Sequence, residues 1–515
     1  MKVTNRSLPR KSAGERARNG GSVVFRSAKG RSFAERKTIL FRVSLGIAFA
    51  LCLACHSAVS AQDADETPIT VKELQAHAAF LASDTLQGRE AGTAGGQAAA
   101  AYLANELRLL KCKPIGSGND YRQPFGAGYQ NVLGLLEGSD PQLKDEWIVL
   151  GAHFDHVGFG NVENSQGPFG QIHNGADDNA SGVACLLEIA EALKGAPPLG
   201  RSVAVAFWDG EEKGLLGSEH WLKQHPKRQQ IRFYINLDMV GRLRDDTVEM
   251  VGVRTMLGLR SQLARANASE LKLTFDWSQR NDSDHYSFYL RSIPYAMFYT
   301  GMHNDYHRPS DDIEKLNIPG MQRVATVVTR YTTQLANYSE PLVFRKACQY
   351  ELTPLTPKIP LPSRLGVTWS PARVRGETIK LSKVNPDLVA DRAGLKPGDE
   401  LRTINGQDVR EVDDFIAWVR QSPVHWEIDL VRAATGEPDH VALDLDGFAL
   451  PPGASAASSA AEPGIVYLTL VKEASFAAQS GFLPGDRIQR VQEGSAPSAR
   501  HWEVERDGRL LVLPQ

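Results

Sequence analysis

Short apolar runs that end in acidic or histidine side chains dominate the sequence between Thr67 and Tyr338. EWIVLGAHFDH, SVAVAFWDGEE and RFYINLDMVG each read as a buried strand followed by polar residues. Helical stretches rich in alanine and leucine, such as SGVACLLEIAEALKG, alternate with these runs. This alternation predicts an α/β fold in which helices cover both faces of a sheet. Ligands of such sheets collect at the carboxyl ends of the strands, so we expect the functional site there.

Five polar clusters end predicted elements of this region. They are His153 with Asp155, Asp177 with Asp178, Glu211 with Glu212, Asp238 alone, and Tyr306 with His307. A single acidic residue in a glycine-rich turn is commonly a turn former or a helix cap, but five clusters at strand ends need a shared explanation. Carboxylates gathered at one edge of an apolar sheet repel one another unless cations neutralise them. Histidine and carboxylate ligands without cysteine favour zinc, with manganese and cobalt as weaker candidates.

The order of these motifs resembles a known family. FLASDTLQGREAGT, GAHFDHVG, GADDNASG, FWDGEEKGLLGSE, YINLDMVG and DYHRPSDD follow one another along the chain. Together they are similar to the co-catalytic di-zinc aminopeptidases of clan MH, which are related to glutamate carboxypeptidase and the transferrin receptor ectodomain. The resemblance covers about Thr67 to Tyr338. It implies a mixed, largely parallel central β-sheet flanked by helices, and two Zn²⁺ ions as cofactors.

The resemblance also assigns the metal ligands. His153 and Asp238 match the ligands of one zinc ion, and Glu212 and His307 match the ligands of the other. Asp178 matches the carboxylate that bridges the two ions.

Three further residues match catalytic positions. Glu211 matches the general base that takes a proton from a metal-activated water. Asp155 matches a carboxylate that orients the imidazole of His153. Tyr306 lies where some members place a phenol that hydrogen-bonds the developing oxyanion. Sequence alone does not say which of the two adjacent glutamates ligates the metal and which moves the proton.

Most polar residues next to these positions are interpreted as structural rather than as ligands. We expect Asp177 to shape its turn or support the ligands, and the resemblance implies a cis peptide after the bridging residue, at Asp178–Asn179. His156 and His173 flank a glycine-rich loop and are interpreted as loop or pocket-wall residues. His303, four residues before His307, is the competing candidate for that ligand.

The sequence changes character after Tyr338. A proline-rich linker is predicted over 341–361, a PDZ domain over 362–446 and a low-complexity linker over 447–463. AGLKPGDELRTING is repeated 87 residues later as SGFLPGDRIQRVQEG, so 464–515 is predicted to be a degenerate or truncated second PDZ-like module. The loop of the first module at Leu365-Gly366-Val367 resembles a site that captures a peptide C-terminus by β-augmentation.

The N-terminus reads as an export signal. Residues 1–61 combine a long basic segment with an uncharged apolar run from Val43 to Ala54, which is too short to span a bilayer. Cleavage is expected before Gln62, giving a secreted or periplasmic protein. An uncleaved membrane anchor and a lipid on Cys55 are the alternatives.

Charge and cysteine content narrow the function further. Residues 1–42 carry twelve Lys or Arg and two Glu, so the 58 basic and 60 acidic side chains of the whole chain become 46 and 58, a net charge of −12. That balance argues against a nucleic-acid partner. Cysteines 112, 185 and 348 are too irregularly spaced for a disulfide framework or a cysteine zinc site.

These observations predict an exported zinc exopeptidase that acts on peptides or proteins. An aminopeptidase is the leading hypothesis, with the PDZ domain recruiting peptide chains. A carboxypeptidase or dipeptidase of the same family is the first alternative. Glutaminyl cyclase, which shares the fold but uses one metal, and a non-catalytic receptor-like protein are weaker alternatives, because all five ligand positions are filled.

Overall fold

The protein is described here by a computed structural model. It describes residues 68–515 except 269, 352–357, 360–363, 371–377, 410–411, 422–424, 446–448, 460–461, 493–500 and 515. The predicted signal segment, its apolar run and Cys55 lie outside the described residues. Among the described helices, none combines the length and the apolar character needed to cross a membrane.

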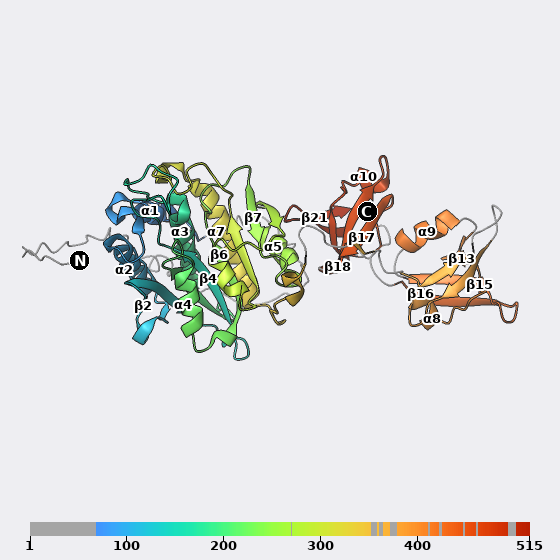
Figure 1. The fold of residues 1–515 in the computed structure, drawn as a ribbon. Coiled ribbons are helices and arrows are strands. Elements are labelled where there is room, and N and C mark those ends of the chain that lie inside the picture. The colour runs from blue at the N-terminus through green and yellow to red at the C-terminus, as the bar shows by residue number, and fades with distance from the viewer. Residues whose placement is uncertain are drawn as a thin grey trace, which may run out of the picture. The chain divides into compact units, whose positions relative to one another are not determined.

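A mixed nine-stranded sheet forms the centre of the first part of the chain (Figure 1). Its strands are β1 (Lys113–Pro114), β2 (Arg122–Phe125), β3 (Tyr129–Leu136), β4 (Trp147–His153), β5 (Ser202–Trp208), β6 (Ile231–Leu237), β7 (Thr247–Val251), β8 (Lys272–Asp276) and β9 (Tyr295–Tyr299). They follow the order β1-β3-β5-β4-β6-β9-β7-β8, and β2 pairs with β3. The four central strands β5, β4, β6 and β9 run parallel, so their carboxyl ends meet at one edge. The predicted α/β fold with a mixed, largely parallel core is confirmed.

Helices cover both faces of this sheet. One face packs against α1 (Val71–Leu81), α2 (Ala94–Leu109), α3 (Gly182–Gly195), α5 (Leu259–Asn267) and α7 (Ile318–Ala336). The other face packs against α4 (Leu216–Gln224) and α6 (His285–Tyr289), which contribute buried Trp221 and Phe288. The β5 side chains are buried throughout, as expected for a central strand that is covered on both faces.

The region predicted as a PDZ domain forms its own small sheet and core. The sheet follows the order β11-β12-β13-β15-β16, with β14 on β13. The elements are β11 (Val367–Trp369), β12 (Ile379–Val384), α8 (Val389–Arg392), β13 (Glu400–Ile404), β14 (Gln407–Asp408), α9 (Val412–Gln421), β15 (His425–Val431) and β16 (Pro438–Asp444). Strand β11 lies at the edge of this sheet, and Gly366 just before it has a φ of +85°.

The sequence repeat corresponds to a structural repeat. The second copy lies in a sheet of β10 (Lys358–Ile359), β17 (Ala454–Ser459), β18 (Glu462–Val471), β19 (Arg487–Gln492), β20 (His501–Arg506) and β21 (Arg509–Pro514), with α10 (Phe476–Gln479). In the first copy the carboxylate of Asp399 accepts the N–H of Lys396 and pairs with Arg432. In the second copy Asp486 likewise accepts the N–H of Leu483 and pairs with Arg506. Each Pro-Gly-Asp turn is therefore fixed by the same contacts.

Strand β17 lies within the segment predicted to be a low-complexity linker. Its small residues pair with β18 from Ala454 opposite Val471 onward. Backbone hydrogen bonds of a strand do not depend on side-chain size, so composition alone did not reveal it.

Candidate metal centre

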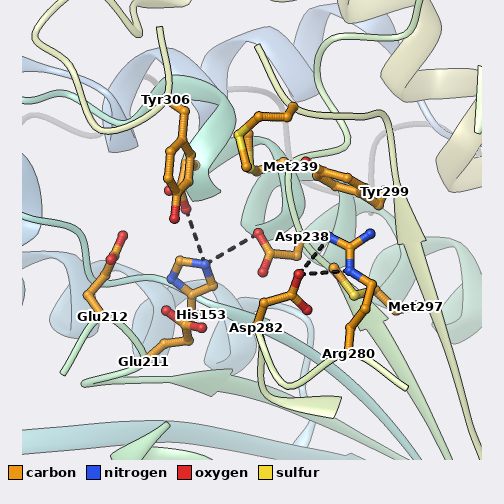
Figure 2. Close-up of a pocket in the computed structure, with 12 residues that line it drawn as sticks. His153, Glu211, Glu212, Asp238, Met239, Arg280, Asp282, Met297, Tyr299 and Tyr306 are labelled. Atoms are coloured by element: carbon orange, nitrogen blue, oxygen red, sulfur yellow. Dashed lines mark hydrogen bonds and ion pairs between the residues drawn. The ribbon is translucent and has the colours of Figure 1, made fainter. Parts of the chain in front are cut away.

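The four parallel strands bring the predicted ligands to one edge of the sheet. His153 is the last residue of β4, and Asp238 follows the last residue of β6. Glu211 and Glu212 lie in the loop after β5, and His307 lies in the segment after β9. Figure 2 shows the side chains of His153, Glu211, Glu212 and Asp238 around one pocket, which Asp178 also lines.

Asp178 lies between two imidazoles. Its Oδ1 is 3.3 Å from Nε2 of His153, and its Oδ2 is 3.1 Å from Nε2 of His307. The Asp178–Asn179 peptide is cis, as the family resemblance implies. Because each carboxylate oxygen faces a different histidine, the side chain has the arrangement that a bridging ligand requires.

Two more carboxylates complete the arrangement. Oδ1 of Asp238 lies 3.5 Å from Nε2 of His153, and Oε2 of Glu212 lies 3.2 Å from Nε2 of His307. Two donors that each bind a tetrahedral zinc ion at about 2.0–2.1 Å are about 3.3 Å apart. The separations between ligand atoms therefore suit the donor set to zinc.

In both His153 and His307, the second ring nitrogen, Nδ1, contacts a backbone carbonyl. Nδ1 of His307 donates to the carbonyl of Asn164 over 2.8 Å. Nδ1 of His153 lies 3.2 Å from the carbonyl of Asp155. These contacts leave Nε2 of each ring facing the carboxylates, and Nε2 of His307 is buried without a hydrogen bond among the described residues. Both rings thus have the tautomer of a metal ligand.

The adjacent glutamates have opposite pKa shifts. Burial and the neighbouring Glu212 raise the pKa of Glu211 well above its usual range, although His153 opposes them. Burial and Asp178 oppose ionisation of Glu212, but the hydrogen bond from His156 and the nearby imidazole of His307 outweigh them and lower its pKa to about 2. These shifts favour the ionised form of Glu212, which a metal ligand requires, and the protonated form of Glu211.

Asp155 acts differently from the prediction. Its carboxylate lies 3.8 Å from Nδ1 of His153, beyond hydrogen-bond distance. Instead, its Oδ1 accepts the N–H of Glu211 at 3.1 Å and its Oδ2 accepts the N–H of Glu212 at 3.3 Å. These two backbone groups occupy the carboxylate, so Asp155 positions the glutamate loop and the backbone of Asp155 orients His153.

Tyr306 lies over the cluster. Its ring stacks on His307 with centroids 3.9 Å apart. In Figure 2 its phenol end points toward His153 and the carboxylates. Burial and the nearby Asp178 raise the pKa of Tyr306, so it stays protonated and can donate a hydrogen bond.

The three remaining histidines near the cluster differ in the groups that they contact. Nε2 of His303 lies 3.0 Å from Oδ2 of Asp177, so the competing candidate supports the turn rather than the ligand set. Nε2 of His173 lies 2.6 Å from the hydroxyl of Ser165. His156 is closer to the centre than its interpretation as a pocket wall implied. It joins Asp178, Glu212 and His307 in a group whose nitrogen and oxygen atoms all lie within 4.8 Å of one another.

Arg89 was not identified from the sequence. Its side chain is fully buried, and it donates hydrogen bonds to the carbonyls of Leu81, Phe154, Asn174 and Gly175. Burial lowers its pKa to about 10, which leaves it charged at neutral pH. The guanidinium therefore joins the loop after β4 to the loop that enters α3. The sequence feature that could have pointed to Arg89 is its position in the LQGREAGT motif, between predicted elements.

Asp311 was also missed, although it belongs to the DYHRPSDD motif. Its Oδ2 accepts the backbone N–H groups of Asp177 at 2.8 Å and of Asp178 at 3.1 Å. Its Oδ1 accepts from Arg242 at 2.8 Å. Asp311 thus fixes the backbone that carries the carboxylate predicted to bridge the metal ions.

The pocket beside the cluster has an apolar wall and one cation. Met239, Met297 and Tyr299 line it in Figure 2, together with Arg280 and Asp282. Nη1 of Arg280 donates to Glu249 over 2.7 Å, and its Nε donates to Asp282 over 2.8 Å.

Family models and known proteins match parts of this chain. A family model described as Peptidase family M28 matches residues 131–332, and one described as PDZ domain matches residues 381–431. Aminopeptidase YwaD of Bacillus subtilis is 31% identical over 214 residues, which are 39% of this chain and 43% of that protein. A probable glutamate carboxypeptidase, LAMP1, of Arabidopsis thaliana is 32% identical over 118 residues, 22% of this chain and 15% of that protein.

The chain thus spans less than half the length of these two curated relatives. Among solved structures, a zinc aminopeptidase from Bacillus subtilis superposes with a TM-score of 0.44 at 18% identity, covering 54% of this chain and 99% of that chain.

Proposed function

We propose that this chain is a zinc-dependent aminopeptidase, since a model of peptidase family M28 matches residues 131–332 and a PDZ domain model matches residues 381–431. The observation that carries the proposal is the position of Asp178, with one oxygen 3.3 Å from His153 and the other 3.1 Å from His307. His153, Asp178 and Asp238 would hold one zinc ion. Asp178, Glu212 and His307 would hold the other. Zinc ions bound there would polarise the scissile carbonyl and lower the pKa of a water molecule toward 7.

Glu211 and Tyr306 supply the proton chemistry. As water adds to the carbonyl carbon, the carboxylate of Glu211 accepts its proton, and the raised pKa of that group favours retention of the proton. The C–N bond then breaks, and Glu211 gives the proton to the leaving amine. The hydroxyl of Tyr306 donates a hydrogen bond to the oxygen on which negative charge develops.

The charges that line the pocket favour an aminopeptidase over a carboxypeptidase. Arg280 is the one Lys or Arg among the described lining residues, and Asp282 and Glu249 already hold its guanidinium. A substrate α-carboxylate would need an uncommitted cation. The same lining carries the carboxyl groups of Asp282, Asp238 and Glu211, and this acidic character favours a cationic α-amino group over an anionic α-carboxylate.

The test is metal-dependent cleavage by the purified full chain. Chelation should abolish hydrolysis of aminoacyl anilides, and zinc should restore it, with two ions bound per chain. N-acetylated peptides should be inert. Release of C-terminal residues from N-acetylated peptides would replace this proposal with the carboxypeptidase alternative.

Matched variants of two glutamates test the general base. Glu211→Gln should lower kcat by about 10²–10⁴-fold with both zinc ions still bound. Glu219→Gln is the control, because Glu219 lies in α4 and pairs with Arg291 and Lys223. Equal activity in the two variants would exclude Glu211 as the base.

The PDZ domain is proposed to recruit peptide chains. Strand β11 is an edge strand, so a peptide can add beside it, and the loop at Leu365 and Gly366 precedes it directly. Fluorescent peptides with a free C-terminal carboxylate should bind the full chain, whereas the same peptides with an amidated C-terminus should not.

Export is proposed from the sequence of residues 1–61 alone. The basic segment and the apolar run from Val43 to Ala54 support it. Mass spectrometry of the mature protein should find Gln62 at its N-terminus. An acylated N-terminal Cys55 would establish lipid anchoring instead.

A further inference from the structure

His156 is buried between a predicted metal ligand and the turn that leads to the bridging aspartate. Its Nδ1 lies 2.9 Å from Oε1 of Glu212 and 3.8 Å from Oδ2 of Asp178. Its ring packs on Gly175, where a Cβ atom would lie only 2.5 Å from the imidazole Cδ2. The ring is therefore held in place from both sides.

The contacts of His156 differ from those of the two histidines assigned as ligands. His153 and His307 each direct Nε2 toward the carboxylates and place Nδ1 against a backbone carbonyl. Nε2 of His156 is buried and has no hydrogen-bond partner among the described residues. If Nδ1 of His156 bound a metal ion, the ring proton would lie on Nε2 without an acceptor. With the proton on Nδ1, it is donated to Glu212 and no N–H is left unpaired.

The two carboxylate oxygens of Glu212 therefore have different partners. Oε1 accepts from His156, while Oε2 lies 3.2 Å from Nε2 of His307 on the side of the metal site. A carboxylate with one oxygen engaged in this way presents the other as a monodentate ligand. Glu211 has no corresponding contact with His156 among the described hydrogen bonds.

We propose that His156 is a positioning residue, whose Nδ1–H holds Oε1 of Glu212 so that Oε2 is directed to the zinc ion shared with Asp178 and His307. The inference rests on the proposed di-zinc site. Its consequence is that His156 selects Glu212, rather than Glu211, as the ligand of the tandem pair. The role is absent from the set of matched family positions and follows from the contacts of the ring alone.

The experiment compares His156→Ala with His156→Asn. Asparagine places its Nδ2–H₂ close to the position of the imidazole Nδ1–H, so it keeps the donor while removing the imidazole nitrogen as a possible ligand. Zinc affinity is measured on metal-depleted full-length protein by competition with a chromophoric chelator. Cobalt absorption spectra report the ligand environment of the two sites separately.

The alanine variant should bind the second zinc ion about 10–100-fold more weakly than wild type, with the affinity for the first ion unchanged. The asparagine variant should recover most of this affinity. His225→Ala is the control, because His225 contacts Trp147 and Trp221 away from the cluster. Thermal unfolding identifies any variant that has lost its fold.

Two results would overturn the inference. One is wild-type affinity for both ions in His156→Ala. The other is equal weakening in the alanine and asparagine variants, which would make His156 itself a ligand. Fewer than two zinc ions in the wild-type protein would instead contradict the proposed function, so the two failures are distinguishable.

Discussion

The carboxylate of Asp311 accepts the backbone N–H of Asp178 over 3.1 Å, and the same oxygen accepts the N–H of Asp177 over 2.8 Å. The proposed bridging ligand is therefore fixed through its backbone by a residue 133 positions later in the chain. Asp311→Ala should leave two buried N–H groups and Arg242 without this partner. We expect a loss of about 3 kcal/mol in unfolding free energy and weaker binding of both zinc ions.

Urea unfolding and zinc titration check this expectation. Asp312→Asn is the neighbouring control, since the carboxylate of Asp312 accepts a side-chain hydrogen bond from Asn174 and contacts neither Asp177 nor Asp178 among the described hydrogen bonds. An Asp311→Ala protein with wild-type zinc affinity would show that the turn does not need this carboxylate.

Arg89→Lys should destabilise the protein although the charge is kept. The guanidinium donates to four carbonyls in different directions, and a lysine ammonium cannot span them. The expected loss is about 3 kcal/mol in urea unfolding, because buried carbonyls lose their donors. Arg108→Lys in α2 is the matched exposed control and should change stability by less than about 0.5 kcal/mol.

Gly175→Ala should be severely disruptive. Gly175 has a φ of +54°, and an added Cβ would collide with the carbonyl oxygen of Asp178. The left-handed conformation and the collision together should cost more than about 2 kcal/mol. Gly195→Ala at the end of α3 has no atom within 4 Å of the new Cβ and should be neutral or stabilising. Similar unfolding midpoints for the two variants would contradict this reading of the turn.

Asp209 should make stability fall as pH rises. Burial raises its pKa to about 6, above the value of about 3.9 in an unfolded chain. Between pH 4 and 6 the folded chain thus binds more protons than the unfolded chain, and the stability contributed by the protonated form is lost as pH rises through 6. The contribution is about 3 kcal/mol at most. Asp209→Asn should flatten this part of the stability profile, measured by urea unfolding from pH 4 to 8 at constant zinc.

The three described cysteines should be unreactive in the folded protein. Burial raises the pKa of Cys112 to about 11 and that of Cys348 to about 11, and it raises the pKa of Cys185 as well. A chromogenic disulfide reagent at pH 8 should therefore modify none of them until denaturant is added. Rapid modification of the native protein would show that one of these sites opens locally.

The strand-end position of the ligands could be predicted because parallel strands bring distant residues to one edge. His153, Asp238 and Glu212 follow three such strands, and the structure brings them together with Asp178 and His307. The supporting residues could not be predicted in the same way. Arg89 and Asp311 act on backbone groups of other segments, and no spacing in the sequence encodes such contacts.

The proposed roles of Glu211 and Glu212 show a second limit of prediction from the sequence. Both have the same side chain and adjacent positions, so the sequence cannot rank them without the resemblance. Their different neighbours, His156 and His307 for Glu212 and a buried carboxyl-rich environment for Glu211, arise only in the folded chain.

Arg89, Asp155 and Asp311 hold the ligand-bearing loops entirely through protein groups. A site whose backbone is fixed in this way offers the same ligand spacing to every divalent ion, so the geometry of the site, and not the intrinsic order of affinity alone, should govern which ion it retains. Copper(II) stands above zinc in that intrinsic order but favours a tetragonal arrangement of ligands. Copper(II) should therefore displace zinc less readily than the intrinsic order predicts.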